Sequence, residues 1–285
     1  MIKEYNLIFY GPSSTTTDQE LYERYVDQIH QVLVDCGLFT SVVKNKPSEL
    51  PETNPYEAYY VEAFIDDDRV LRFELTGEPN VIGSGTNANK SLNKQQLRMY
   101  YANGDYSIRA YPTTTGWTNT TGYGFRKAYV TSNGVFFRFF IYYASSGGVT
   151  RSGYSAVVIA KSNKRCPIVI APIDTGNGSY SSTRYSTLVC HQYGIASVNY
   201  EDPGYLSSTT TASYYESRYN YATTGKQTML FPFLAGGDTN YDYSYSKYAC
   251  WMPYAPNSIR NGGLQKVLVN GKAYIIDGYF ALRDD

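Results

Sequence analysis

Apolar residues recur at three- and four-residue steps from Asp18 to Cys36, and this pattern predicts an amphipathic helix. Ser13–Thr17 and Asp18 offer side-chain oxygens for its N-terminus, and Gly37 is suited to end it. No other window of the sequence has a comparable helical pattern. We therefore predict a mainly β-structured protein built around this helix. The apolar positions that share its buried face are Leu21, Tyr22, Tyr25, Val26, Ile29, Val32, Leu33 and Cys36.

Short apolar runs flank this helix and predict a small α+β unit over residues 1–80. Strands are expected at residues 5–10 and 38–44, followed by a hairpin of residues 56–65 and 69–77 around the acidic turn Asp66-Asp67-Asp68. The helix is expected to cover one face of their sheet. Residues 81–122 are polar and glycine-rich, which predicts long loops around a short helix at Gln95–Tyr101 and a strand at Tyr106–Tyr111.

Residues 123–285 read as a tyrosine-rich antiparallel β body, similar to a sandwich. A hairpin is expected around Asn133-Gly134 as a type I′ turn, which would place Val130 opposite Phe137 on a core face and Tyr129 opposite Arg138 as a cation–π pair on a wetter face. A second Asn-Gly hairpin and a last strand close the chain. The predicted fold class is α+β, predominantly antiparallel β. Further strands are expected at Ser155–Ala160, Ile168–Ile173, Ser186–Gln192 and Met229–Leu234.

The charges balance overall but not along the chain. Lys plus Arg and Asp plus Glu are 25 each, so net charge gives no reason to expect a nucleic-acid partner. Residues 1–80 hold 15 acids and 6 bases, which leaves 10 acids and 19 bases in the remainder. Such a chain could dock its own halves or stack on copies of itself through Glu23 and Asp27 of the helix. The alternative is that most of these charges are solvated loop residues.

Cysteine spacing and hydropathy indicate a reducing compartment and no membrane segment. Cys36, Cys166, Cys190 and Cys250 lie far apart without a C-x-x-C pair, so we expect buried thiols. No apolar run is long enough for a membrane span or a secretory signal. We expect synthesis in a reducing cytoplasm and no membrane partner.

Signals for catalysis are weak, and we predict no enzyme activity, no cofactor and no metal. The two histidines, His30 and His191, lie in a predicted helix and strand, and His191 points away from its neighbour Cys190. The stretch Gly83–Ser91 lacks the glycine spacing of a phosphate-binding loop. A pair of carboxylates for glycan hydrolysis stays open, since such pairs meet only in three dimensions.

Aromatic side chains give a better indication of binding. Trp117 and Trp251 have rings that stack on sugars or anchor protein interfaces, although both could equally be core residues. Tyr243 and Tyr245 alternate with polar residues, so one face of their strand would be tyrosine. With Arg138 they complete the candidate interaction residues.

The C-terminal segment LQKVLVNGKAYIIDGYFALRDD resembles the closing segment of virion structural proteins of tailed bacteriophages. The shared pattern is a short strand, an Asn-Gly turn, a Tyr-Ile strand and a terminal strand. The resemblance covers about the last fifth of the chain and implies a component of tail, neck, baseplate or capsid surface that works by self-assembly. Its partners would be copies of itself and other virion proteins. The alternative is a glycan- or receptor-binding β-sandwich module.

Overall fold

The computed structural model confirms a predominantly antiparallel α+β fold with several β-sheets. It describes residues 2–92, 94–103, 107–110, 125–144, 150–163, 167–173, 186–191, 194–199, 231–235, 244–251, 265–269, 271–277 and 280–285. The chain forms two compact units. The helix unit comprises Glu4–Tyr129 and Phe137–Ser155, and the C-terminal unit comprises Met1–Lys3, Val130–Phe136 and Ala156–Asp285.

Helix α1 spans Asp18–Cys36, as the periodicity predicts, and buries all of the predicted apolar face. Its first turn is closed by a capping box, in which Glu20 N donates to Thr17 Oγ1 at 3.1 Å and Thr17 N donates to Glu20 Oε2 at 2.7 Å. Gly37 ends the helix in the left-handed region at φ 65°, and its N–H donates to Val34 O. Cys36 is a buried thiol. These local signals explain why the sequence predicts the helix so closely.

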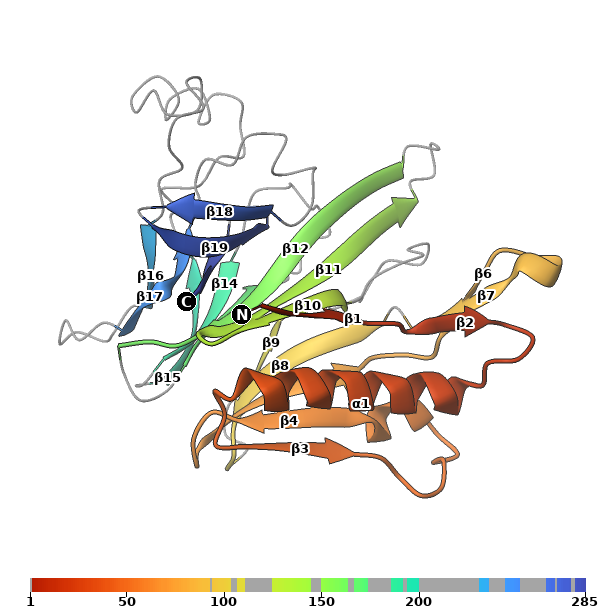
Figure 1. The fold of residues 1–285 in the computed structure, drawn as a ribbon. Helices are drawn as coiled ribbons and strands as arrows, with labels where there is room; N and C mark the ends of the chain where they lie inside the picture. Colours follow the sequence, from red (N-terminus) through yellow and green to blue (C-terminus); the bar gives the residue numbers. More distant parts are fainter. Residues whose placement is uncertain are drawn as a thin grey trace. The chain divides into compact units, whose positions relative to one another are not determined.

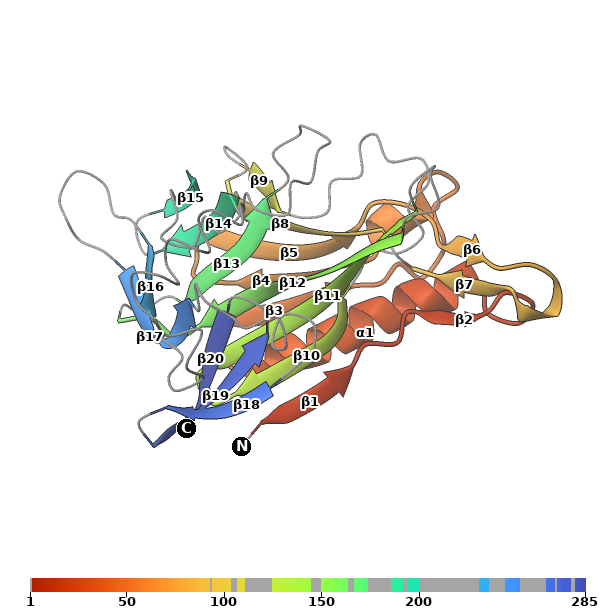
Figure 2. The same ribbon diagram turned by 90° about the horizontal axis from the view of Figure 1, so that it is seen from above.

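The helix packs on a five-stranded antiparallel sheet of the same unit, with the order β3-β4-β5-β8-β9. Figures 1 and 2 show α1 lying along β3 and β4, and it packs against both strands. The register places Val61, Phe73 and Leu97 side by side on one apolar face, and all three are buried. The strands are β3 (Ser41–Asn45), β4 (Tyr60–Phe64), β5 (Arg69–Leu75), β8 (Gln95–Tyr101) and β9 (Ser107–Ala110).

The predicted short helix at Gln95–Tyr101 is wrong, because this segment is strand β8. Its Gln, Leu, Arg and Met residues favour a helix locally. In the structure, however, it pairs with β5 along its whole length, and this pairing buries Leu97 and Met99. Tertiary pairing therefore outweighs local propensity. Through β8 and β9, residues beyond 80 extend the sheet that begins in the predicted N-terminal unit.

A second, three-stranded sheet with the order β2-β7-β6 belongs to the same unit. Figures 1 and 2 show β6 and β7 extending past the N-terminal end of α1. The single strand predicted at residues 5–10 is instead divided into β1 and β2, and Leu7 and Phe9, in the segment that connects them, are buried. The elements are β1 (Lys3–Asn6), β2 (Tyr10–Pro12), the short 3₁₀ helices η1 (Pro55–Ala58) and η2 (Gly85–Asn87), β6 (Asn80–Ile82) and β7 (Asn89–Ser91).

Three long strands, β10 (Phe125–Thr131), β11 (Gly134–Ala144) and β12 (Thr150–Ala160), contribute residues to both units. The turn between β10 and β11 is Ser132-Asn133, one residue earlier than predicted.

The predicted type I′ turn at Asn133-Gly134 and its register are wrong. A type I′ turn needs positive φ at both of its central residues. Among the described non-glycine residues, Asn54 is the one with positive φ, so the φ of Asn133 does not fit that turn. Strand β10 ends at Thr131 and β11 begins at Gly134, so the two-residue turn between them does not leave Val130 opposite Phe137. The face predicted to be wetter is also buried near the turn, where Tyr129 is 2% exposed.

Contacts distant in sequence fix this turn within the C-terminal unit. The Asn133 carbonyl accepts from Lys161 N at 2.9 Å, and its side-chain amide donates to Asp285 Oδ1 at 2.8 Å. Ser132 Oγ also donates to the main-chain oxygen of Asp285. These contacts hold Asn133 in a conformation that its local sequence does not predict.

Two further strand arrangements complete the C-terminal unit. Strands β12, β13, β14 and β15 pair in sequence order, and a five-stranded sheet has the order β16-β17-β20-β19-β18. Ala249, Ile275 and Leu282 are buried on one face of the latter sheet. The predicted C-terminal hairpin and last strand are confirmed. The strands are β13 (Ile168–Ile173), β14 (Ser186–His191), β15 (Gly194–Asn199), β16 (Phe231–Ala235), β17 (Ser244–Trp251), β18 (Gln265–Val269), β19 (Lys272–Asp277) and β20 (Phe280–Asp284).

Candidate interaction surfaces

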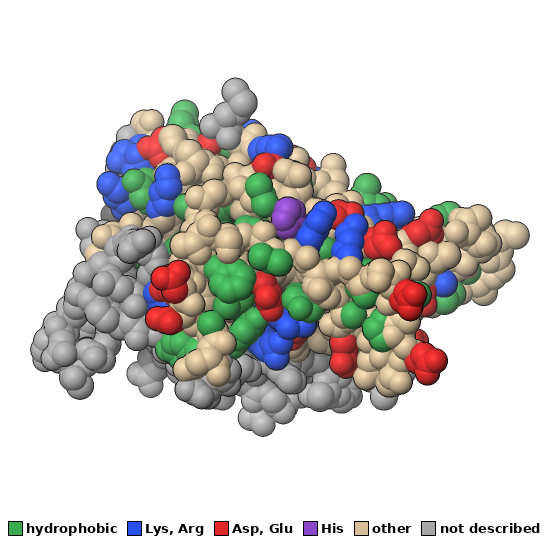
Figure 3. Space-filling view, turned by 90° about the horizontal axis from the view of Figure 1, so that it is seen from below, with side chains coloured by type: hydrophobic (Ala, Val, Ile, Leu, Met, Phe, Trp, Pro, Cys, Tyr) green, Lys and Arg blue, Asp and Glu red, His purple; other side chains and the backbone are tan. Residues whose placement is uncertain are grey.

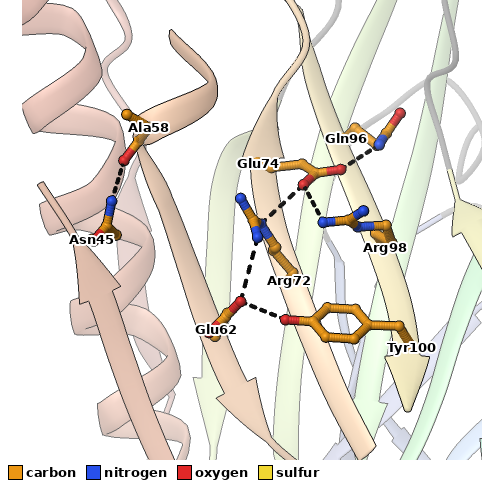
Figure 4. A network of polar contacts seen from close by, with 8 residues as sticks. All are labelled: Asn45, Ala58, Glu62, Arg72, Glu74, Gln96, Arg98 and Tyr100. Atoms are coloured by element: carbon orange, nitrogen blue, oxygen red, sulfur yellow. Dashed lines mark hydrogen bonds and ion pairs between the residues drawn. The ribbon is translucent and has the colours of Figure 1, made fainter. Parts of the chain in front are cut away.

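The face of the five-stranded sheet opposite Phe73 carries a connected polar network (Figure 4). Its members alternate with buried apolar residues along β4, β5 and β8, so the period of two in each strand places them together. We call this set the polar face. It consists of Tyr60, Glu62, Arg72, Glu74, Gln96, Arg98 and Tyr100.

Arg72 lies at the centre of the polar face and joins its two carboxylates. Its Nη1 is 3.5 Å from Glu62 Oε1, and its Nε is 2.9 Å from Glu74 Oε2. Its guanidinium carbon lies 3.5 Å from the centroid of the Tyr60 ring, a cation–π contact. Arg98 Nη2 reaches Glu74 Oε2 at 3.2 Å. The network therefore ties three neighbouring strands together.

Neutral donors complete the hydrogen bonding of the same carboxylates. Tyr100 donates its phenol to Glu62, and Gln96 donates its side-chain amide to Glu74. Burial and the bond to Glu62 raise the pKa of Tyr100, so the phenol stays protonated at neutral pH. Figure 4 also shows Asn45 donating to the Ala58 carbonyl, at 2.6 Å, across the end of the sheet.

This geometry favours a structural role for Glu62 and Glu74 over catalysis. Glycan hydrolysis needs one carboxylate that can give up a proton and another that can attack or activate water. Here Arg72 lies between the two carboxylates, and each of them accepts a further hydrogen bond from its own sheet. The polar face therefore stabilises the pairing of β4, β5 and β8.

Replacing Arg72 with Met is expected to lower the free energy of unfolding by about 2 kcal/mol, because two largely buried carboxylates lose their shared cation. The side chains of Arg72, Glu62 and Glu74 are 18%, 18% and 12% exposed, so solvent screens only part of this loss. Urea denaturation at pH 7 measures the effect. Lys272→Met makes the same charge change at an exposed position and should shift the midpoint little. Equal shifts in the two variants would contradict the role of Arg72.

The outer face of α1 carries Glu23 and Asp27, the two acids predicted to meet a basic partner. Asp27 is held by two lysines of its own unit, with Lys44 Nζ at 2.8 Å and Lys46 Nζ at 2.6 Å. Glu23 accepts from the Gln19 side chain at 2.9 Å. Figure 3 shows acidic and basic side chains interspersed on the side of the molecule that it views. The basic partners of Asp27 therefore belong to its own unit.

Asp27→Asn is expected to cost about 0.5 kcal/mol at pH 7, because the Asp27 side chain is 46% exposed. Burial acts to raise the pKa of Asp27, but the hydrogen bonds and charges of Lys44 and Lys46 outweigh it and lower this pKa. A lowered native pKa contributes stability above the unfolded value of about 3.9, and this contribution is lost as pH falls through the native value. Denaturation of both proteins between pH 7 and pH 2.5 should show that the difference in their free energies of unfolding becomes smaller as the pH falls. A difference that does not change with pH would contradict the lowered pKa of Asp27.

Exposed apolar side chains are found on strands at the edges of sheets. Tyr10 on β2 is 52% exposed, Val43 on β3 is 48%, Val81 on β6 is 59% and Leu268 on β18 is 78%. Each of these strands is the first or last in its sheet. Ile8, Val34 and Leu50 are also exposed but lie outside strands. We call the first four the edge residues, because each lies on an edge strand, the part of a sheet at which another chain can pair.

The three-stranded sheet is held at the N-terminal end of α1. Lys90 Nζ on β7 pairs with Asp18 Oδ1 at 2.9 Å, and Arg24 Nη1 donates to the Tyr10 carbonyl at 3.0 Å. Lys90 is the lysine of the glycine-rich stretch considered for phosphate binding. Because it lies in a strand and not at the start of a helix, the structure gives this stretch no phosphate-loop geometry.

The remaining predicted interaction residues are not brought together by the described structure. Trp117 and Tyr243 lie outside the described residues. Tyr245 and Trp251 are on β17, where Trp251 is opposite Phe231 and Phe280 in the register, and Arg138 is half-buried on β11. None of the polar-face residues is among the interaction residues predicted from the sequence. The alternation of polar and apolar residues in β5 and β8 is the signal that indicates the polar face.

Within the described residues, no group of three or more His, Cys, Asp or Glu side chains is placed to hold a metal ion. In the same part of the chain, no helix has the length and hydropathy needed to cross a membrane. Comparison with protein-family models, curated proteins and solved structures finds no match to this chain.

Proposed function

We propose that the protein is a non-enzymatic structural component of a tailed-bacteriophage virion, associated with the tail, neck or baseplate and acting through contacts between many protein copies. One observation carries this proposal: Tyr10, Val43, Val81 and Leu268 are exposed on edge strands. Exposed apolar side chains on the edge strands of a sheet favour contact with another protein chain.

The internal pairing of polar groups supports the same reading. On the polar face, Glu62, Arg72 and Glu74 are bound to one another, and on α1 Asp27 is bound by lysines of its own unit. These charges are paired within their own unit, where they help to hold its strands and helix together. Assembly through edges suits a multi-copy particle, in which a small contact is repeated by symmetry.

The C-terminal segment that resembles virion proteins contains one of the edge residues. The segment that resembles them, Leu264–Asp285, contains β18, β19 and β20. Leu268, the edge residue with the largest exposed fraction, 78%, lies within it. The segment that suggests a virion component is thus also the segment with the most exposed edge residue.

Light scattering over a range of protein concentrations tests the proposal. The wild-type chain should show a mass above that of the monomer that rises with concentration. Val81→Lys combined with Leu268→Lys should lower this mass, since charged side chains on edges oppose pairing. Leu50→Lys, which charges an exposed apolar residue outside a strand, is the matched control and should leave the mass unchanged.

A wild-type chain that stays monomeric at every concentration would contradict the proposal. If that monomer also bound a glycan array, the glycan- or receptor-binding alternative would replace it. Equal loss of mass in the Leu50→Lys control would show that exposed apolar residues in general, and not strand edges, drive association.

A further inference from the structure

We propose that β18 pairs antiparallel with β18 of a second copy of the chain, around a two-fold axis at Val267. This inference rests on the proposed function, because it assumes that copies of the chain contact one another. Strand β18 is an edge of its five-stranded sheet and has β19 as its neighbour among the described strands. Leu268 on this strand is 78% exposed, and Lys266 is exposed beside it.

The register of the C-terminal hairpin shows which main-chain groups of β18 face outward. Val269 is opposite Lys272, with two residues between them, so these two form a hydrogen-bonded pair as in any two-residue hairpin. Hydrogen-bonded pairs alternate along the strands, so Val267 and Gln265 also bond to β19. The N–H and C=O groups of Lys266 and Leu268 therefore point to the open edge.

The next turn gives the same assignment independently. Asp277 is opposite Phe280, again with two residues between them, so Asp277 bonds to β20. By alternation Ala273 and Ile275 also bond to β20, which leaves Lys272, Tyr274 and Ile276 to bond to β18. Both turns therefore direct the main-chain groups of Lys266 and Leu268 outward.

A two-fold axis at Val267 uses all of these outward groups. In that register Lys266 of each copy is opposite Leu268 of the other, and both pairs are hydrogen-bonded. The strands overlap over their full length from Gln265 to Val269. An axis at Leu268 would overlap only residues 267–269 within the strands, and the main-chain groups of Lys266 would have no partner strand.

The side chains of this register are also complementary. Lys266 and Leu268 are two residues apart, so they lie on the same face of the strand. Across the axis, the aliphatic part of each Lys266 would cover the exposed Leu268 of the other copy while its ammonium stays in water. The two Lys266 residues would be diagonal neighbours, which keeps their charges apart.

The two edges of this sheet differ in how well they can accept a strand. The opposite edge, β16, contains Pro232, and its pairing with β17 shifts register after that residue. Proline and a bulge are features that block edge pairing. Strand β18 has no proline, and its register with β19 is continuous. Among the described strands, β18 is thus the edge of this sheet that suits pairing, and a second copy is the partner that matches its outward groups symmetrically.

Cysteine cross-linking tests both the pairing and its register. At the axis, two Val267→Cys residues would form a non-hydrogen-bonded pair with Cα atoms about 4.5 Å apart, within disulfide range. Two Lys266→Cys residues would be diagonal at about 7–8 Å, too far for a disulfide. Mild oxidation should therefore give about tenfold more dimer with Val267→Cys than with Lys266→Cys. Mixing Lys266→Cys with Leu268→Cys should restore cross-linking, and the wild-type chain controls for the native cysteines.

Leu268→Pro provides a second measurement, with circular dichroism to check the fold. It removes an outward N–H and the exposed side chain but no hydrogen bond between β18 and β19. We expect the variant to fold and to lose the mass that β18 pairing adds in light scattering. If Val267→Cys and Lys266→Cys cross-link equally, or Leu268→Pro leaves the mass unchanged, the β18 pair is overturned while a multimeric wild type still supports the proposed function. A strictly monomeric wild type would overturn both.

Discussion

Gly134→Ala is expected to destabilise the protein by about 4 kcal/mol, an effect near the upper end for single substitutions. Gly134 is the first residue of β11 and lies against the backbone of β12. A Cβ there would be 2.1 Å from the Ile159 carbonyl oxygen and 2.9 Å from Ala160 Cα. Both are main-chain atoms of a paired strand, so they cannot move aside as the end of a side chain can. The adjacent turn is also held, because Asn133 O accepts from Lys161 N.

Urea denaturation of Gly134→Ala and Gly271→Ala measures this effect against a matched control. Gly271 has φ 75°, so alanine is strained there, but a Cβ would meet nothing within 4 Å. Its cost should be about 1 kcal/mol, from the backbone alone. Equal costs in the two variants would contradict the close approach of β11 and β12 at Gly134.

Phe73→Ala is expected to lower the free energy of unfolding by about 4 kcal/mol, as for other fully buried phenylalanines. Phe73 lies on β5 between Val61 and Leu97, and its side chain has no solvent exposure. Its ring centroid is 5.1 Å from that of Phe137. Truncation would leave a cavity in the core of the helix unit, which rigid neighbouring strands can fill only in part.

Phe64→Ala provides the control for Phe73, since it removes the same side chain from the same sheet. Phe64 is half-buried on β4, and the register places it on the side of the polar face. Its truncation should cost about 1 kcal/mol, because less apolar area is removed from a partly wet surface. If the two variants have similar denaturation midpoints, the assignment of core and outer face to this sheet is wrong.

The sequence predicts those parts of the fold that depend on nearby residues. Helix α1 has its cap at Thr17, its apolar face and its terminating Gly37 within one short stretch, so its bounds follow from local chemistry. The C-terminal hairpin is equally local, because its two strands are adjacent and joined by a two-residue turn. These elements match their predictions.

Elements that depend on distant residues are predicted less well. Strand β8 has helix-favouring residues but pairs with β5, from which it is separated by β6 and β7. The turn at Asn133 departs from its Asn-Gly signal because Lys161 and Asp285, both far along the chain, hold it. In each case a contact that no local pattern encodes decides the conformation.

The candidate surfaces require the same non-local information. Arg72 and Glu74 are close in sequence, but their link to Glu62 depends on the register of β4 with β5. The exposed Leu268 side chain becomes a candidate contact only when the strand order is known, because that order places β18 at an edge of its sheet. Charge counting predicted a basic partner for Asp27 outside its own unit, and it could not show that Lys44 and Lys46 of the same unit bind this side chain.

Native mass spectrometry combined with negative-stain imaging of the purified chain tests the central claim most directly. If the protein acts by assembly through its sheet edges, the spectrum should contain multiples of the 32.1 kDa chain, and the images should show particles of repeated subunits. The variant with Val81→Lys and Leu268→Lys should shift both toward the single chain. A wild-type protein found only at 32.1 kDa and imaged only as single molecules would contradict the account.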